Sequence, residues 1–272
     1  MIKLLSRVGS EAKMPYRVCK GSVNFRNKMA DRLYKKFCIE LDKNAIESVC
    51  ATEDFTTALK NTLHPYKIAF NVNAETGSKN KGTLTPQFSV KNSGENSAII
   101  SCESFTLSLP MNEDKKIIID KYCAAHEVRH LFDHILNPKM SLARWTNQFN
   151  NQHYDTNINI VRDKLFNEFD NPLNIQELEK DITGHLSSVP DEISVEVLQK
   201  ARYQLKTEIN AYKNELNYMK RGFGWFKNFK RILYLEISLK QNAKFPQKLK
   251  FINRLLRKKF ANLRSTNNEL LK

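Results

Sequence analysis

Apolar and polar residues alternate in three short segments of the first half of the chain. These segments are residues 68–72, 84–90 and 98–107, and turn-forming Gly, Asn and Ser residues separate them. Alternation with a period of two is typical of strands that bury one face. Pro86, inside the second segment, suits an edge strand because proline cannot donate a ladder hydrogen bond. The pattern predicts three strands in a small, mostly antiparallel sheet.

Elsewhere the apolar residues recur every three or four positions, which is typical of amphipathic helices. One or two helices are expected in residues 20–61, where Met29, Leu33, Phe37 and Leu41 share a face. Further helices are expected in residues 112–137, 157–186, 188–220 and 225–263. The last segment is interpreted as two basic amphipathic helices that break near Pro246.

These elements predict an α+β fold, in which a small, mostly antiparallel sheet packs on a helical bundle, with extra helices at both ends. The expected organisation is an N-terminal helical segment (1–60), a central domain (61–221) and basic amphipathic C-terminal helices (222–272). A chain of 272 residues with 41% hydrophobic residues can bury a core of this kind.

Composition limits the classes of protein that fit. No run of 18 apolar residues occurs, and the first residues lack the apolar stretch of a signal peptide. The five cysteines are odd in number and include no Cys-x-x-Cys pair, which argues against a disulfide framework. A reducing cytosol is therefore the expected compartment.

The motif His126-Glu127-Val128-Arg129-His130 lies within the helical pattern of residues 112–137. Residues four apart share a helix face, so the imidazoles of His126 and His130 can bind the same zinc ion. Glu127 is then beside the water on that ion, where it can act as a general base. The alternative is a helix face that carries two histidines by chance. A catalytic zinc site also needs a third protein ligand.

Glu208 is the best candidate for the third ligand. It continues an apolar stripe on the helix of residues 188–220, which runs through Ile193, Val197, Ala201, Leu205, Tyr212, Leu216 and Met219. A carboxylate at such a position is costly unless it meets a cation, and zinc meets that need. The alternative is that Glu208 extends into water or pairs with a lysine.

Other candidate ligands fit less well. Glu168, Glu192 and Glu215 fall off the apolar stripes or in less regular segments. His134 lies two turns beyond His126, too far along a continuous helix to share one ion, and is expected at the surface or behind a ligand. Asp133 shares the face of His130 and is a candidate to orient an imidazole. Cys123 is interpreted as a small buried residue.

The His126-Glu127-Val128-Arg129-His130 motif, followed by Glu208-Ile209-Asn210-Ala211-Tyr212, resembles the zincin metallopeptidases, specifically the gluzincins, whose third ligand is a glutamate on a second helix. The resemblance covers only these two helical segments. It implies a zincin-like metallopeptidase domain in residues 61–221, whose sheet precedes the active-site helix and pairs its edge strand with a peptide substrate.

The resemblance also implies a mechanism. His126, His130 and Glu208 hold one Zn²⁺ per chain, and Glu127 takes a proton from the water on the metal and passes it to the leaving amine. The reaction is hydrolysis of a peptide bond in a protein substrate, by an endopeptidase rather than an exopeptidase. Four side chains are open candidates for stabilising the oxyanion: Tyr203, Tyr212, His153 and His185.

The C-terminal segment from Lys227 to Lys272 carries a net charge of +11, out of +15 for the chain. An anionic membrane surface or an acidic protein is the expected partner, and nucleic acid is disfavoured, although packing of the apolar stripe on the rest of the chain is the simpler interpretation. The rival function is a non-enzymatic helical adaptor that binds a membrane surface or nucleic acid. A further hypothesis is that the protein acts as a secreted effector in a host cytosol.

Overall fold

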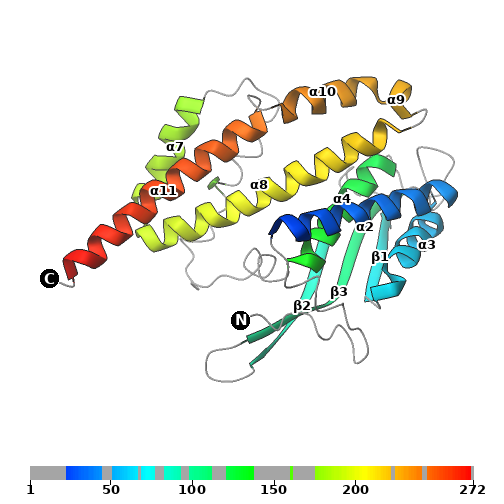
Figure 1. Cartoon of the computed structure of the whole chain (residues 1–272), viewed down its shortest axis with the longest axis horizontal. Helices are drawn as coiled ribbons and strands as arrows, with labels where there is room; N and C mark the ends of the chain where they lie inside the picture. The colour runs from blue at the N-terminus through cyan, green and yellow to red at the C-terminus, as the bar shows by residue number, and fades with distance from the viewer. Residues whose placement is uncertain are drawn as a thin grey trace. The chain divides into compact units, whose positions relative to one another are not determined.

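The computed structural model describes residues 23–44, 51–66, 69–76, 83–92, 98–111, 121–137, 160–161, 175–221, 224–240 and 244–270, and in the strands it describes the backbone and its pairing (Figure 1). The chain divides into two compact units. Unit 1 comprises Met1–Leu142 and Asn210–Ile232, and unit 2 comprises Ala143–Ile209 and Leu233–Lys272. The predicted division into three sequence segments is a different partition of the chain and stays a prediction.

Two helices begin the described part of unit 1. Helix α2 (Val23–Asn44) buries a stripe of residues three and four apart, formed by Ala30, Leu33, Tyr34, Phe37, Cys38 and Leu41. Helix α3 (Thr52–Leu63), followed by the short 3₁₀ helix η1 (His64–Tyr66), packs against it. The rings of Phe37 and Phe55 meet edge to face with centroids 5.3 Å apart. The helical spacing predicted for this region is confirmed.

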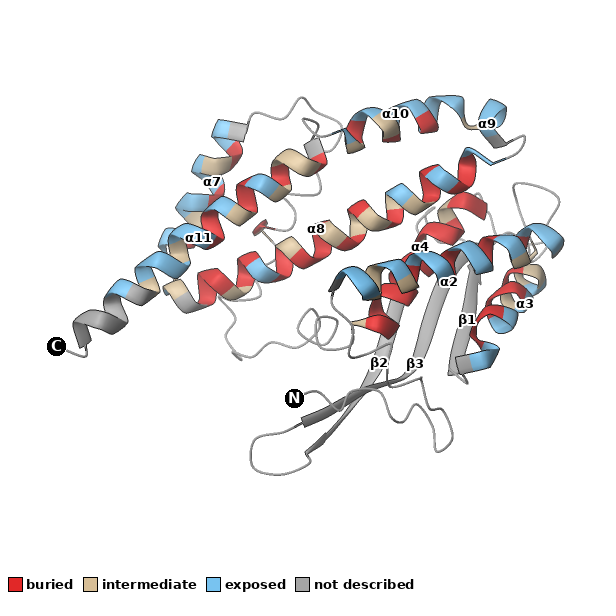
Figure 2. Ribbon diagram, in the orientation of Figure 1, coloured by how far each residue is buried: buried red, intermediate tan, exposed pale blue. Residues whose placement is uncertain are grey.

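Helix α4 (Lys121–Leu136) is the most deeply buried element of unit 1. Every residue of this helix is buried except Cys123 and Glu127, which are half-buried (Figure 2). A helix that is covered on all sides holds its side chains in fixed positions, which suits a site that needs defined geometry. The expected start at Asn112 falls in residues 112–120, outside the described residues.

Three strands contact these helices. The strands are β1 (Ala69–Thr76), β2 (Thr83–Asn92) and β3 (Ala98–Met111), in the order β1-β3-β2. β2 pairs antiparallel with β3, with an irregularity between Gln87 and Phe88, and β1 pairs parallel with β3 from Ala69 to Thr76. β2 is thus an edge strand among the described strands, as Pro86 suggested.

The predicted fold class is wrong. We expected α+β with a mostly antiparallel sheet as a main component, but 93% of the residues whose side chains the structure describes lie in helices, and none lies in a strand. The described core is built by helices, and the small sheet is mixed rather than mostly antiparallel. Alternating patterns indicate where strands begin and end, but not how much of the core they form or which partner each strand takes.

Unit 2 is helical in its described part. Helix α7 (Ile175–Ser187) and the first part of helix α8 (Asp191–Met219) are joined by a short turn, and the Ser194 hydroxyl of α8 donates to the Leu186 carbonyl of α7 over 3.1 Å. Helix α11 (Lys244–Leu270) is held to them by Arg254, which pairs with Glu179, and by Lys259, which lies 2.6 Å from the carboxylate of Asp191. The bounds of α8 agree closely with the helix predicted for residues 188–220. The part of α8 from Asn210 onward belongs to unit 1.

The short helix α9 (Gly224–Lys227) and helix α10 (Phe229–Leu239) lie between α8 and α11 in sequence. The predicted break near Pro246 is confirmed, because α10 ends at Leu239 and α11 begins at Lys244. Pro246 itself lies in the first turn of α11, where its missing N–H costs no hydrogen bond. None of the described helices combines the length and the apolarity needed to cross a membrane.

Candidate metal centre

His126 and His130 lie one turn apart on α4, and their Nε2 atoms are 3.2 Å apart. Each residue is buried, with 6% of its surface exposed. Two nitrogen ligands of a tetrahedral zinc ion, each about 2.05 Å from the metal, are separated by about 3.3 Å. The pair therefore has the separation of one edge of a zinc coordination tetrahedron.

Glu208 completes a group of three potential ligands. The ligand atoms of His126, His130 and Glu208 all lie within 4.8 Å of one another. Glu208 is half-buried and lies one turn before Tyr212 on α8, and the Tyr212 ring is 4.5 Å from that of His126. Because α8 is one continuous helix, this contact also fixes the position of the Glu208 backbone. The third ligand chosen from periodicity thus lies with the two histidines.

The other ring nitrogen of His126 is held by Glu215. His126 Nδ1 lies 3.0 Å from Glu215 Oε2, and the second carboxylate oxygen accepts a hydrogen bond from Arg231 Nε over 2.5 Å. A carboxylate accepts, so Nδ1 carries the proton and Nε2 presents its lone pair. Carboxylates that orient ligand histidines in this way are common behind zinc ions.

Glu215 is fully buried, yet it is held ionised. Burial acts to raise its pKa, but in the metal-free protein, where His126 can carry a second proton, the hydrogen bond and charge of His126 and the charge of Arg231 together lower the pKa of Glu215 below its ordinary value. For Arg231, burial acts to lower the pKa, and the nearby Glu215 carboxylate more than offsets this, so the net pKa is raised. The sequence pattern ranked Glu215 only as a weak third ligand and did not identify Arg231, since neither lies near the motif in sequence.

Glu127 is the half-buried residue next to His126 on α4. Its position differs from that of the histidines, because adjacent helix residues point about 100° apart. Glu127 is not a member of the three-residue ligand group. Its role as general base stays a prediction.

Three residues in or near the motif helix have a burial or a contact that differs from the prediction. His134 is buried, with 2% of its surface exposed, so the surface location considered for it is wrong. Asp133 is paired with Arg129, whose Nη1 lies 2.5 Å from Asp133 Oδ1, instead of orienting an imidazole. Cys123 is half-buried rather than fully buried.

Of the four candidates for oxyanion stabilisation, Tyr212 is the one that lies in unit 1, in contact with the His126 ring. Tyr203 is buried and His185 is half-buried, both in unit 2, and His153 lies outside the described residues. Tyr212 is therefore the candidate that the described geometry favours.

A scan against protein-family models, a search of curated proteins and a search of solved structures find no match for this chain. The resemblance to gluzincins thus rests on the residues of α4 and α8 alone.

Proposed function

We propose that the protein is a zinc-dependent metallopeptidase in which His126, His130 and Glu208 hold one zinc ion and Glu127 is the general base. The observation that carries this proposal is the three-residue ligand group on α4 and α8, in which two buried imidazoles have nitrogens 3.2 Å apart. Two histidines and one carboxylate are a ligand set found in catalytic zinc sites, which keep a further position open for water or substrate.

The surroundings of the group support a catalytic site rather than a chance cluster. The Glu215 carboxylate and the Arg231 guanidinium hold His126 in the tautomer that a metal ligand requires. A chance pair of surface histidines would need no such support. The burial of α4 also keeps the two imidazoles from rotating away from each other.

Zinc, when bound, supplies a Lewis acid that polarises the scissile carbonyl and lowers the pKa of a coordinated water. Glu127 would serve as the general base, accepting a proton from the attacking water and passing it to the leaving amine, so that water is added across the broken peptide bond. The Tyr212 hydroxyl donates a hydrogen bond to the carbonyl oxygen as negative charge develops there. The proposed substrate is a peptide bond within a protein chain.

Hydrolysis of an unfolded protein such as casein tests this function, with zinc content measured in the same samples. Glu127→Gln keeps the size of the side chain and the metal ligands but removes the base, so we expect full zinc content and a loss of about 10²–10⁴-fold in rate. Glu53→Gln, an exposed residue of α3, is the matched control and should retain the wild-type rate. Zinc-loaded wild type that cleaves no peptide bond would overturn the peptidase proposal.

The alternative is a non-enzymatic helical adaptor that binds a membrane surface or nucleic acid through its basic C-terminal helices. The two functions differ in metal content, because the adaptor has no need of zinc. The proposed place of action is a cytosol, either that of the producing cell or that of a host. If a tagged form of the protein never enters host cells, action in a host cytosol is ruled out.

A further inference from the structure

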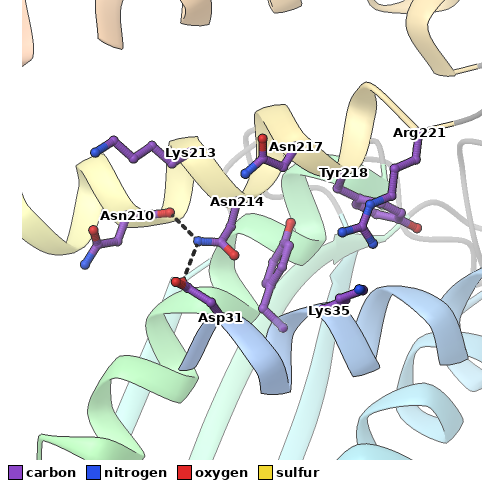
Figure 3. Close-up of a pocket in the computed structure, with 9 residues that line it drawn as sticks. Asp31, Lys35, Asn210, Lys213, Asn214, Asn217, Tyr218 and Arg221 are labelled. Atoms are coloured by element: carbon purple, nitrogen blue, oxygen red, sulfur yellow. Dashed lines mark hydrogen bonds between the residues drawn. The ribbon is translucent and has the colours of Figure 1, made fainter. Parts of the chain in front are cut away.

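A polar pocket lies between α2 and the second part of α8, within unit 1 and on a face of α8 other than the one that carries Glu208 and Glu215. Its volume is about 390 Å³. The pocket is lined by Asp31, Tyr34 and Lys35 of α2 and by Asn210, Lys213, Asn214, Asn217, Tyr218 and Arg221 of α8 and the turn that follows it (Figure 3). None of these residues belongs to the candidate metal centre.

The charge of this pocket is unbalanced. Lys35, Lys213 and Arg221 carry three positive charges at its wall, and none of them forms an ion pair with an acidic side chain in the part of the chain that the structure describes. In Figure 3 the charged ends of Lys35 and Arg221 face one another, whereas Lys213 points along α8 away from them. Like charges that lie close together repel, and an anion between them relieves this repulsion. Lysine and arginine are also the side chains that commonly bind phosphate.

The single acid of the pocket is already engaged. Asp31 Oδ1 accepts hydrogen bonds from Arg129 Nη2 and from Asn214 Nδ2, both over 3.1 Å (Figure 3). Asn214 Nδ2 also donates to the Asn210 carbonyl over 2.9 Å. Asp31 thus forms its hydrogen bonds with partners outside the cationic group, and the three positive charges outnumber its single negative charge.

Tyr34 also lines the pocket. It has 3% of its surface exposed, and its hydroxyl is enclosed beside the Cys38 thiol, which is a weak hydrogen-bonding group. Tyr34 therefore forms part of the pocket wall and adds no charge to it.

We propose that this pocket binds a phosphate group, held by Lys35 and Arg221, with the side-chain amides of Asn210 and Asn217 available for neutral polar atoms attached to it. The volume exceeds that of a single phosphate several-fold, since one water occupies about 30 Å³ in the liquid. A small phosphorylated molecule and free phosphate share this chemistry. The proposal is independent of the peptidase function.

Isothermal titration of the full-length protein with inorganic phosphate, glucose 6-phosphate and glucose tests the proposal. We expect one phosphate-bearing probe to bind per chain and glucose not to bind. Tighter binding of glucose 6-phosphate would support a phosphorylated small molecule, and equal affinity for both anions would support free phosphate. No binding of either anion up to about 10 mM would overturn the proposal.

The matched variants are Lys35→Met and Lys36→Met. Both lysines are exposed on α2, but only Lys35 lines the pocket. We expect Lys35→Met to weaken phosphate binding about tenfold and Lys36→Met to change it less than about twofold, because only the first removes a charged hydrogen bond. Equal weakening by both would show a non-specific charge effect and overturn the proposed site. Zinc content is measured alongside and should not change in either variant.

Discussion

His126 is restrained at both of its ring nitrogens. Nδ1 faces the buried Glu215 carboxylate and Nε2 faces His130, so the ring has one orientation and one tautomer. Arg231 in turn fixes the second oxygen of Glu215. The chain of contacts from Arg231 through Glu215 to His126 therefore sets the geometry of the candidate metal centre.

This chain of contacts predicts the effect of Glu215→Gln on metal binding. The amide keeps the shape of the side chain but loses the charge that makes His126 a stronger ligand, so we expect zinc affinity to fall about 10–100-fold. Competition with a chromophoric chelator measures the zinc affinity of both proteins. Glu53→Gln is the control, and a Glu215→Gln protein with wild-type zinc affinity would contradict the orienting role.

Glu215 also predicts how stability depends on pH. Its pKa is lower in the folded protein than its ordinary value of 4.5, so ionised Glu215 stabilises the fold above about pH 4.5. This contribution is lost as the pH falls from there through the lowered pKa. We expect the difference in unfolding free energy between metal-free wild type and Glu215→Gln to shrink over that range in denaturant titrations. A difference that stays constant from pH 6 to about pH 3 would contradict this.

At the scale of elements, α2, α4 and α8 are joined by one buried arginine. Arg129 is fully buried and pairs with Asp133 on its own helix and with Asp31 on α2, which also accepts from Asn214 on α8. Burial raises the pKa of Asp133, and the charge of Arg129 partly offsets that rise. Arg129 thus balances a carboxylate that is otherwise costly to bury.

We expect Arg129→Ala to lower the unfolding free energy by about 3–5 kcal/mol, because it leaves the buried Asp133 without its cation. Asp31→Asn should cost less than about 1 kcal/mol, since the Asp31 side chain is 53% exposed. Chemical denaturation monitored by circular dichroism compares the two. Similar losses for both variants would show that burial of Asp133 is not the source of the effect.

The elements near the motif were predictable to different degrees. Helical spacing locates α4 and α8, and the stripe that runs from Ile193 identifies Glu208, because residues on one face are visible within a single helix. Glu215 and Arg231 were not predictable as a support for His126. The contact between His126 and Glu215 joins positions 89 residues apart, and that pairing depends on how the helices pack. The parallel pairing of β1 with β3 was missed for the same reason.

At the scale of the whole molecule, the sequence predicted where positive charge gathers but not which apolar side chains are exposed to solvent. On α11, Ile252, Leu255 and Leu256 are buried, as expected if the stripe packs on the protein. Trp225 and Phe226, two large apolar side chains, are 42% and 75% exposed. Their exposure depends on the packing of α9, which no local pattern encodes.

An exposed aromatic cluster bears on the predicted membrane partner. Trp225 lies with ring centroids 5.0 Å from Phe226 and 5.6 Å from Phe229, and Lys227 and Lys230 flank the cluster. Aromatic residues beside lysines favour the interface of an anionic bilayer. An anionic membrane surface therefore stays a prediction, now assigned to α9 and the start of α10.

Sedimentation with vesicles of phosphatidylserine and phosphatidylcholine measures this binding. We expect salt-sensitive binding that is mostly lost in the double variant Trp225→Ser and Phe226→Ser. Phe260→Ser on α11 removes an aromatic side chain of similar exposure, 41%, and is the control that should keep binding. Absence of vesicle binding by the wild type would leave an acidic protein as the predicted partner.

Zinc stoichiometry by elemental analysis tests the central claim most directly. We expect about one zinc ion per chain in the wild type and little or none in His126→Ala and Glu208→Ala. His64→Ala and Glu53→Ala are exposed residues outside the ligand group and should retain the metal. No zinc in the wild type after reconstitution would contradict the metal centre, and full zinc content in Glu208→Ala would contradict Glu208 as its third ligand.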